Sequence, residues 1–89
     1  NLDLKNSTVN YYYGIFMQDE RDFRKARKYY NIAFANGMKY NYDLAMRLAV
    51  INAKLGELEN SKYYYQHAYS IKPSKEIKDK ILLLDELKK

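Results

Sequence analysis

Side chains that could carry out acid–base, nucleophilic or metal chemistry are few in this chain, and they are scattered. The sequence has no cysteine and a single histidine, His67, which we interpret as a solvated residue on the outer side of a helix. The acidic pairs Asp19–Glu20 and Asp85–Glu86 are sequence neighbours, and neighbouring side chains on a helix point apart. Catalysis needs groups held in contact, and neither a phosphate-binding glycine loop nor a metal-ligand spacing occurs. The sequence therefore predicts a protein without enzymatic activity, cofactor or metal.

Basic residues are concentrated between residues 21 and 28, where a helix is expected to begin near Phe23. Basic groups beside an aromatic ring, here Tyr29, can bind phosphates and stack on a base, so nucleic acid or an acidic protein surface is one candidate partner. Glu20 and Asp22 dilute the run, however, and the fourth helix has no matching one. A solvated outer face is therefore the favoured interpretation. The candidate residues of this basic stripe are Arg21, Arg24, Lys25 and Lys28.

Length and composition allow one small domain. Sixteen basic and eleven acidic residues give a net charge of +5, and eleven tyrosines supply most of the aromatic content. No apolar run approaches the roughly 18 residues of a membrane span, and no signal peptide opens the chain. Because the first residue is not methionine, we expect the chain to be part of a longer protein, with the cytoplasm as the favoured location.

Hydrophobic spacing and helix-breaking residues predict five helices and no strand. Residues 1–6 form a polar lead-in that we expect to be frayed or disordered. Gly37, Gly56 and Pro73 follow expected helix ends, because glycine accepts positive φ and proline has no N–H. The expected N-cap residues are Ser7 or Thr8, Asp22, Asn41 or Asp43, and Ser74. The expected helices cover approximately residues 7–18, 23–35, 43–55, 57–71 and 75–87.

The second and fourth of these helices carry the same pattern 35 positions apart. Ala26, Tyr30 and Ala33 share one helix face, and Ser61, Tyr65 and Ala68 recur at the same spacing. Small residues on either side of an aromatic one let another helix approach closely, so we expect this face to be buried. We also expect Gly14, in the interior of the first helix, to allow close approach of a neighbouring backbone.

These residues resemble the tetratricopeptide repeat, a helix–turn–helix unit of about 34 residues. The second unit carries Gly56 at the turn and Pro73 at the close, whereas Arg21 and Met38 replace the glycine and proline of the first. The resemblance implies a right-handed α-solenoid with repeats at residues 7–41 and 42–75. Residues 76–89 would form a C-terminal capping helix or the start of a third repeat.

In this family the first helix of each repeat lines a concave groove that binds a peptide or a partner helix. The resemblance thus implies a non-catalytic protein-interaction scaffold, in which Arg47, Lys54 and Asp19 orient the bound segment. The clamp that holds chaperone tails is not expected, because apolar or aromatic residues stand at its lysine and asparagine positions. By position, the groove would be lined by Tyr11, Tyr12, Ile15, Gln18, Asp19, Met46, Arg47, Val50 and Lys54.

Two further expectations concern tyrosine and leucine residues. We expect Tyr13, Tyr30 and Tyr65 to lie in the core, and Tyr11 and Tyr12 to be partly exposed contact residues. The last helix has a broad apolar surface, formed by several residues between 77 and 87. If leucines remain exposed there, the chain could instead be a structural segment that associates with further repeats or with a second copy through this helix.

Overall fold

The computed structural model describes residues 4–87, which form five α-helices and no strand. This confirms the all-α fold class, and each helix begins and ends within two residues of the expected position. Residues 1–3 of the expected lead-in and Lys88 and Lys89 lie outside the described residues. The helices are α1 (Ser7–Asp19), α2 (Phe23–Ala35), α3 (Tyr42–Lys54), α4 (Leu58–Ile71) and α5 (Lys75–Leu87).

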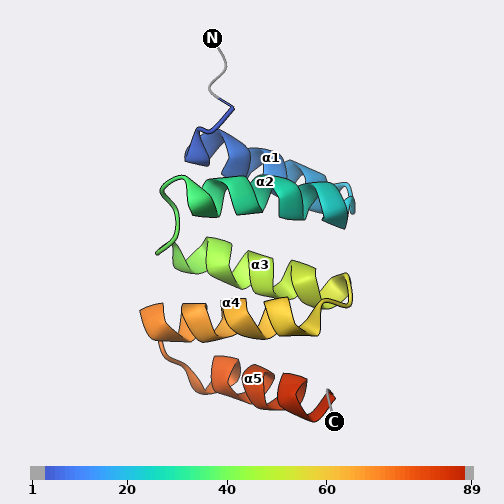
Figure 1. Ribbon diagram of the computed structural model, residues 1–89, viewed down its shortest axis with the longest axis vertical. Coiled ribbons are helices and arrows are strands. Elements are labelled where there is room, and N and C mark those ends of the chain that lie inside the picture. The colour runs from blue at the N-terminus through green and yellow to red at the C-terminus, as the bar shows by residue number, and fades with distance from the viewer. Residues whose placement is uncertain (1–3, 88–89) are drawn as a thin grey trace.

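The helices are stacked in chain order along the longest dimension of the molecule (Figure 1). Each packs mainly on its neighbours in sequence: α1 on α2, α2 on α3, α3 on α4 and α4 on α5. The described residues extend over 47 × 25 × 17 Å, and α1 and α5 lie at opposite ends. Within residues 4–87, α1 is therefore covered mainly by α2, and α5 mainly by α4.

Side chains at the helix starts explain most of the boundaries. Asp22 accepts a hydrogen bond from the Lys25 N–H at 3.2 Å, and Asn41 accepts one from the Leu44 N–H at 2.9 Å. The Ser74 hydroxyl accepts in the same way at the start of α5, at 3.1 Å. Each side chain satisfies a backbone donor that has no partner within its helix.

The cap of α1 differs from the expectation. Asn6, rather than Ser7 or Thr8, accepts a hydrogen bond from the Val9 N–H, at 2.9 Å. The side chain of Asn10 then donates to the carbonyl groups of Leu4 and Asn6, at 2.9 Å in both cases. Asparagine is as good a cap as serine. Asn6 lies one residue before Ser7 and has the extended backbone of a cap residue. These bonds attach residues 4–6 to the first turn of α1.

The core consists of two apolar clusters on either side of α3. In the first, Ala26, Tyr30 and Ala33 of α2 are fully buried against α3. In the second, Tyr65 and Ala68 of α4 are buried with residues of α3 and α5. The equivalent faces of α2 and α4 are thus buried as the sequence predicts.

Gly14 confirms the expectation of a close approach but corrects its partner. A Cβ atom at this position would lie 2.3 Å from Cδ1 of Tyr30 and 2.4 Å from its Cε1. The approaching group is therefore a fully buried aromatic ring and not a backbone. Thirty-five positions later, Ala49 occupies the corresponding place, and its carbonyl accepts a hydrogen bond from Ser61 Oγ at 2.7 Å.

Tyr13, expected in the core, is 44% exposed. Its ring contacts Tyr29 with centroids 5.5 Å apart, but no preceding helix covers it among the described residues. The residue 35 positions later, Leu48, is fully buried because α2 packs on it. The prediction was wrong because a position that is buried inside a stack is exposed at its end.

The turn between α1 and α2 has a backbone conformation that suits glycine, although arginine occupies it. Arg21 has φ = 62°, and Gly56, at the same place between α3 and α4, has φ = 79°. A Cβ atom in this left-handed region crowds the neighbouring carbonyl at a cost of about 1–2 kcal/mol. Arg21 is exposed and its guanidinium lies 5.7 Å from the centre of the Phe23 ring.

We expect Arg21→Gly to raise the free energy of unfolding by about 0.5–1 kcal/mol, because relief of strain exceeds the entropy that glycine adds to the unfolded chain. Urea denaturation followed by circular dichroism measures the change. Gly56→Arg is the matched reverse substitution and should destabilise the protein by about 1–2 kcal/mol. If both variants changed stability in the same direction, backbone strain would not be the cause.

Candidate binding surface

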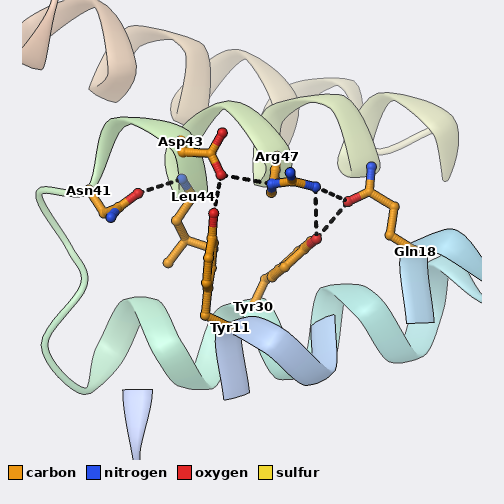
Figure 2. Close-up of polar contacts among 7 residues, drawn as sticks. All are labelled: Tyr11, Gln18, Tyr30, Asn41, Asp43, Leu44 and Arg47. Carbon is orange, nitrogen blue, oxygen red and sulfur yellow. Dashed lines mark hydrogen bonds and ion pairs between the residues drawn. The ribbon is translucent and has the colours of Figure 1, made fainter. Parts of the chain in front are cut away.

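Side chains of α1 and α3 meet on one side of the molecule. Tyr11 and Gln18 extend from α1, and Asp43 and Arg47 from α3, so that residues about 30 positions apart in sequence are in direct contact (Figure 2). Tyr30 reaches the same place from α2. We call the surface formed by these two helices the α1/α3 surface.

A continuous set of hydrogen bonds joins these five polar residues (Figure 2). The Tyr11 hydroxyl donates to Oδ2 of Asp43, which also accepts from Nε of Arg47 at 2.8 Å. Nη1 of Arg47 donates to Oε1 of Gln18 at 3.0 Å and lies 3.5 Å from the Tyr30 hydroxyl. The Tyr30 hydroxyl donates to the same Gln18 oxygen at 2.6 Å. The buried end of Tyr30 is therefore satisfied at the base of this polar cluster.

Burial and these bonds shift the pKa values within the cluster. Burial raises the pKa of Tyr11, and its hydrogen bond to Asp43 raises it further. Burial alone would raise the pKa of Asp43, but hydrogen bonds from Tyr11 and Arg47 outweigh it, so its pKa is lowered. Burial would lower the pKa of Arg47, and the bonds to Asp43 and Tyr30 instead raise it. Asp43 and Arg47 thus remain a charged pair at neutral pH.

The cluster fixes the direction of the Arg47 side chain. Nε and Nη1 are both occupied by protein acceptors, whereas Nη2 takes part in none of these bonds. A guanidinium held in this way is a rigid donor that loses little conformational entropy when it binds a carbonyl or carboxylate oxygen. The Arg47 side chain is 32% exposed, so part of it remains accessible at the surface.

Around this cluster, the predicted groove residues are partly or fully accessible, and none is buried. Tyr11 and Ile15 rest on the first core cluster, and Met46 and Val50 rest on the second. Asp19 is exposed at the end of α1. Together these residues give the α1/α3 surface an apolar floor with charged groups at its edge.

Two predicted groove residues have other main contacts. Tyr12 is 64% exposed and lines an apolar hollow on α1 together with Val9 and Phe16. The ammonium group of Lys54 lies 5.4 Å from the centre of the Phe23 ring. Tyr12 therefore belongs to the exposed surface of α1. Lys54 instead packs on Phe23, at the start of α2.

Asp43 was not expected at the site, although it was considered as a helix cap. It lies four residues before Arg47, the spacing at which an acidic and a basic side chain meet on a helix. This spacing was visible in the sequence. The contacts of Asp43 with Tyr11 and of Arg47 with Tyr30 join separate helices, and no short-range pattern indicates them.

The basic stripe is exposed at all four of its residues, Arg21, Arg24, Lys25 and Lys28. Lys28 lies 5.8 Å from the centre of the Tyr29 ring, so one basic group of the stripe does adjoin an aromatic one. The stripe occupies α2 and the turn before it, whereas the polar cluster joins α1 to α3. The structure thus keeps the two candidate surfaces on different elements.

His67 is not the solvated residue that we expected. It is half-buried, and its Nε2 is hydrogen-bonded to the Lys39 carbonyl. Its ring stacks on Tyr40, with centroids 5.9 Å apart, and meets the edge of Phe34 at 5.2 Å. His67 therefore joins α4 to the end of α2 and to the connection that follows it, which is a structural role.

Residues 4–87 contain neither a cluster suited to a metal ion nor a helix that could span a membrane. Within residues 4–87, no three acidic or histidine side chains gather closely enough to hold a metal ion. None of the helices in the same range combines the length and the apolar character needed to cross a membrane. Comparisons with protein-family models, with curated proteins and with solved structures give no match for this chain.

Stability should decline at alkaline pH because Tyr11, Tyr30, Tyr64 and Tyr65 all have raised pKa values, mainly through burial. Above about pH 10 the unfolded chain loses these protons first, so the folded state binds more protons and stability falls as pH rises. Urea midpoints measured from about pH 8 to about pH 11 test this. Tyr65→Phe should reduce the decline; an unchanged midpoint across the range would contradict the assignment.

Proposed function

We propose that this chain is a tetratricopeptide-like repeat domain that acts as a non-catalytic scaffold for protein–protein interaction. The repeats are assigned to residues 7–41 and 42–75, and α5 serves as a capping helix or as the first helix of a further repeat. Support comes from the matched packing of α2 and α4, and from the left-handed backbone of Arg21 and Gly56 at the same place in both turns. Together they suggest a right-handed α-solenoid whose concave side is the α1/α3 surface.

The observation that carries the function is the fixed orientation of Arg47 beside an accessible apolar floor. An extended peptide or a partner helix would bury apolar side chains on Ile15, Met46 and Val50. Arg47 would then donate to a carbonyl or carboxylate oxygen of the bound segment, which sets its direction. Because the arginine is already ordered, little entropy is lost on binding.

Affinity capture from the source cells, followed by identification of what is bound, tests this proposal. Met46→Gln with Val50→Thr makes the floor polar with little change of volume, and Arg47→Lys removes the planar donor. Arg24→Glu with Lys25→Glu is the control on the basic stripe, because both side chains are exposed on α2. Circular dichroism must first show that every variant is folded.

Loss of one protein partner with the floor pair and with Arg47→Lys, but not with the stripe pair, supports the scaffold. Its direct affinity should then fall about tenfold for Arg47→Lys, the scale of one charge-assisted hydrogen bond. Loss only with the stripe pair, together with recovered nucleic acid whose binding weakens steeply with salt, would move the function to Arg21, Arg24, Lys25 and Lys28. Capture that no variant changes would exclude both surfaces.

A further inference from the structure

An apolar face of α1 is uncovered at the end of the stack. Tyr12, Tyr13 and Phe16 are 64%, 44% and 55% exposed, and Val9 is exposed beside them. The helix itself has no basic residue, so α1 supplies no lysine stem to cover this apolar face. Lys28 of α2 is a basic side chain that lies beside it. Contiguous aromatic exposure of this kind on a small domain marks an interaction surface.

The internal repeat shows what such a face does elsewhere in the same chain. Val9, Tyr13 and Phe16 have fully buried counterparts 35 positions later in α3, which α2 covers with Ala26, Tyr30 and Ala33. The counterpart of Tyr12 is Arg47, which is only half-buried. In α3 this face packs on the helix before it, whereas in α1 the same face is exposed. The exposed residues of α1 and their counterparts in α3 are Val9 and Leu44, Tyr13 and Leu48, and Phe16 and Ile51.

A groove lies beside this face of α1. The equivalent groove 35 positions later, between α3 and α4, is occupied by α2. A hollow of about 450 Å³, which we call the end groove, is lined by Leu4, by Val9, Asn10, Tyr13 and Met17 of α1, and by Lys28, Tyr29 and Ile32 of α2. The counterparts of Tyr29 and Ile32 are Tyr64 and His67. Phe34 of α2 meets both of them edge-on, with centroid distances of 5.3 and 5.2 Å. In the equivalent groove between α3 and α4, an aromatic residue of α2, Phe34, therefore lies against Tyr64 and His67.

The opposite end of the stack has a different character. The α5 residues at the spacing of the covered α3 face, Ile77, Ile81 and Leu84, already lie against α4. Asp85 of α5 forms an ion pair with Lys62 of α4 at 2.6 Å, and Lys78 is exposed. The α5 end thus mixes charges with its exposed leucines, whereas the end groove is largely apolar and aromatic.

We propose that the end groove binds an amphipathic helix whose contact stripe is small, aromatic, small, aromatic, as in Ala26, Tyr30, Ala33 and Phe34 of α2. The partner is a helix of this chemistry, because the filled copy of the groove holds one. Its small residues lie on Tyr13 and Phe16, and its final aromatic ring enters between Tyr29 and Ile32. This site is separate from the α1/α3 surface and does not depend on the function proposed for it.

The test uses the full chain and a synthetic peptide with the sequence of residues 22–36. A hydrocarbon staple joins positions 24 and 28, which are exposed on α2, so that the peptide is helical before it binds. Fluorescence anisotropy of the labelled peptide measures affinity. We expect saturable binding that is about tenfold weaker for Tyr13→Glu and for Phe16→Glu, because each places a charge in an apolar contact.

Matched controls separate docking from general adhesion. In the peptide, Ala33→Glu should abolish binding and Ala35→Glu should not. In the intact protein Ala33 is fully buried where α2 packs on α3, whereas Ala35 is exposed. In the protein, Leu82→Glu changes an exposed leucine of α5 and should leave affinity unchanged. Sedimentation velocity of the chain alone is measured in parallel.

Three results would overturn the proposal. The first is the absence of binding at millimolar peptide. The second is binding that Tyr13→Glu and Phe16→Glu leave unchanged, since the peptide would then have displaced α2 or bound elsewhere. The third is a concentration-dependent dimer that Tyr13→Glu dissociates, because the occupant would then be a second copy of this chain.

Discussion

Replacing Ala68 with glutamate should remove most of the stability of this fold. Ala68 is fully buried in the cluster that joins α4 to Ala45, Ala49 and Ile77. A carboxylate there has neither water nor a basic partner in the cluster, and we expect a cost of about 4 kcal/mol. Small domains have a free energy of unfolding of only about 5 kcal/mol or somewhat more. The variant should therefore be close to its unfolding midpoint without denaturant.

Urea denaturation at pH 7 measures this loss, with Gln66→Glu as the matched control. Gln66 lies two residues earlier on the exposed side of α4, so it adds the same charge to the same helix without burying it. Its stability should change by less than about 0.5 kcal/mol. Burial disfavours the charged form of the introduced carboxyl, so the deficit of the Ala68 variant should shrink as the pH falls toward about 4. Equal stability of the two variants would mean that Ala68 is not at a helix contact.

Adding a single methyl group at Gly14 should be destabilising, although alanine is the better helix former. In an open helix, Gly→Ala gains about 1 kcal/mol. At Gly14 the new Cβ would lie 2.3 Å from the Tyr30 ring. That ring cannot easily move, because it is fully buried and its hydroxyl is bonded to Gln18. Overpacking of this kind costs about 1–3 kcal/mol, so after the gain in helix propensity we expect a net loss of up to about 2 kcal/mol.

A double-mutant cycle with Tyr30→Leu identifies the origin of the effect. Leucine removes the ring atoms that the new methyl group would meet, so Gly14→Ala should be neutral or stabilising in that background. The coupling energy between the two positions should be about 2 kcal/mol in magnitude. If Gly14→Ala stabilised the protein that retains Tyr30, Gly14 would not be in close contact with the Tyr30 ring.

The elements of the fold could be predicted from the sequence because local signals define them. Asp22 and Asn41 cap their helices as expected, and Gly37 and Gly56 have the positive φ that a helix end requires. The first cap was misplaced because Asn6, Ser7 and Thr8 are all competent, and only the bonds of Asn10 to the preceding carbonyls favour Asn6. Where several neighbouring residues can each cap a helix, such further contacts determine which of them does so.

Exposure at particular positions was harder to predict than the helices themselves. Tyr13 and Tyr30 have the same side chain, and each lies on the apolar face of its own helix. Tyr30 is nevertheless buried, whereas Tyr13 is exposed. The difference lies in what precedes each helix in the stack. Likewise, Arg47 was expected at the binding surface by its position in the repeat. Of the bonds that orient it, only that to Asp43 lies within its own helix, and the others come from α1 and α2. Sequence periodicity identifies a helix face but does not identify its neighbour.

The stacking of helices in chain order also determines how the molecule responds to tension. Because α1 and α5 lie at opposite ends of the 47 Å dimension, a pull on those two helices acts along the stack. Each interface between neighbouring helices then carries the load in series, since most contacts link helices that are neighbours in sequence. Because each unit of such a stack contacts mainly its neighbours, we expect the helices to detach one after another under tension. The domain would behave as a compliant spring between whatever its two ends are attached to.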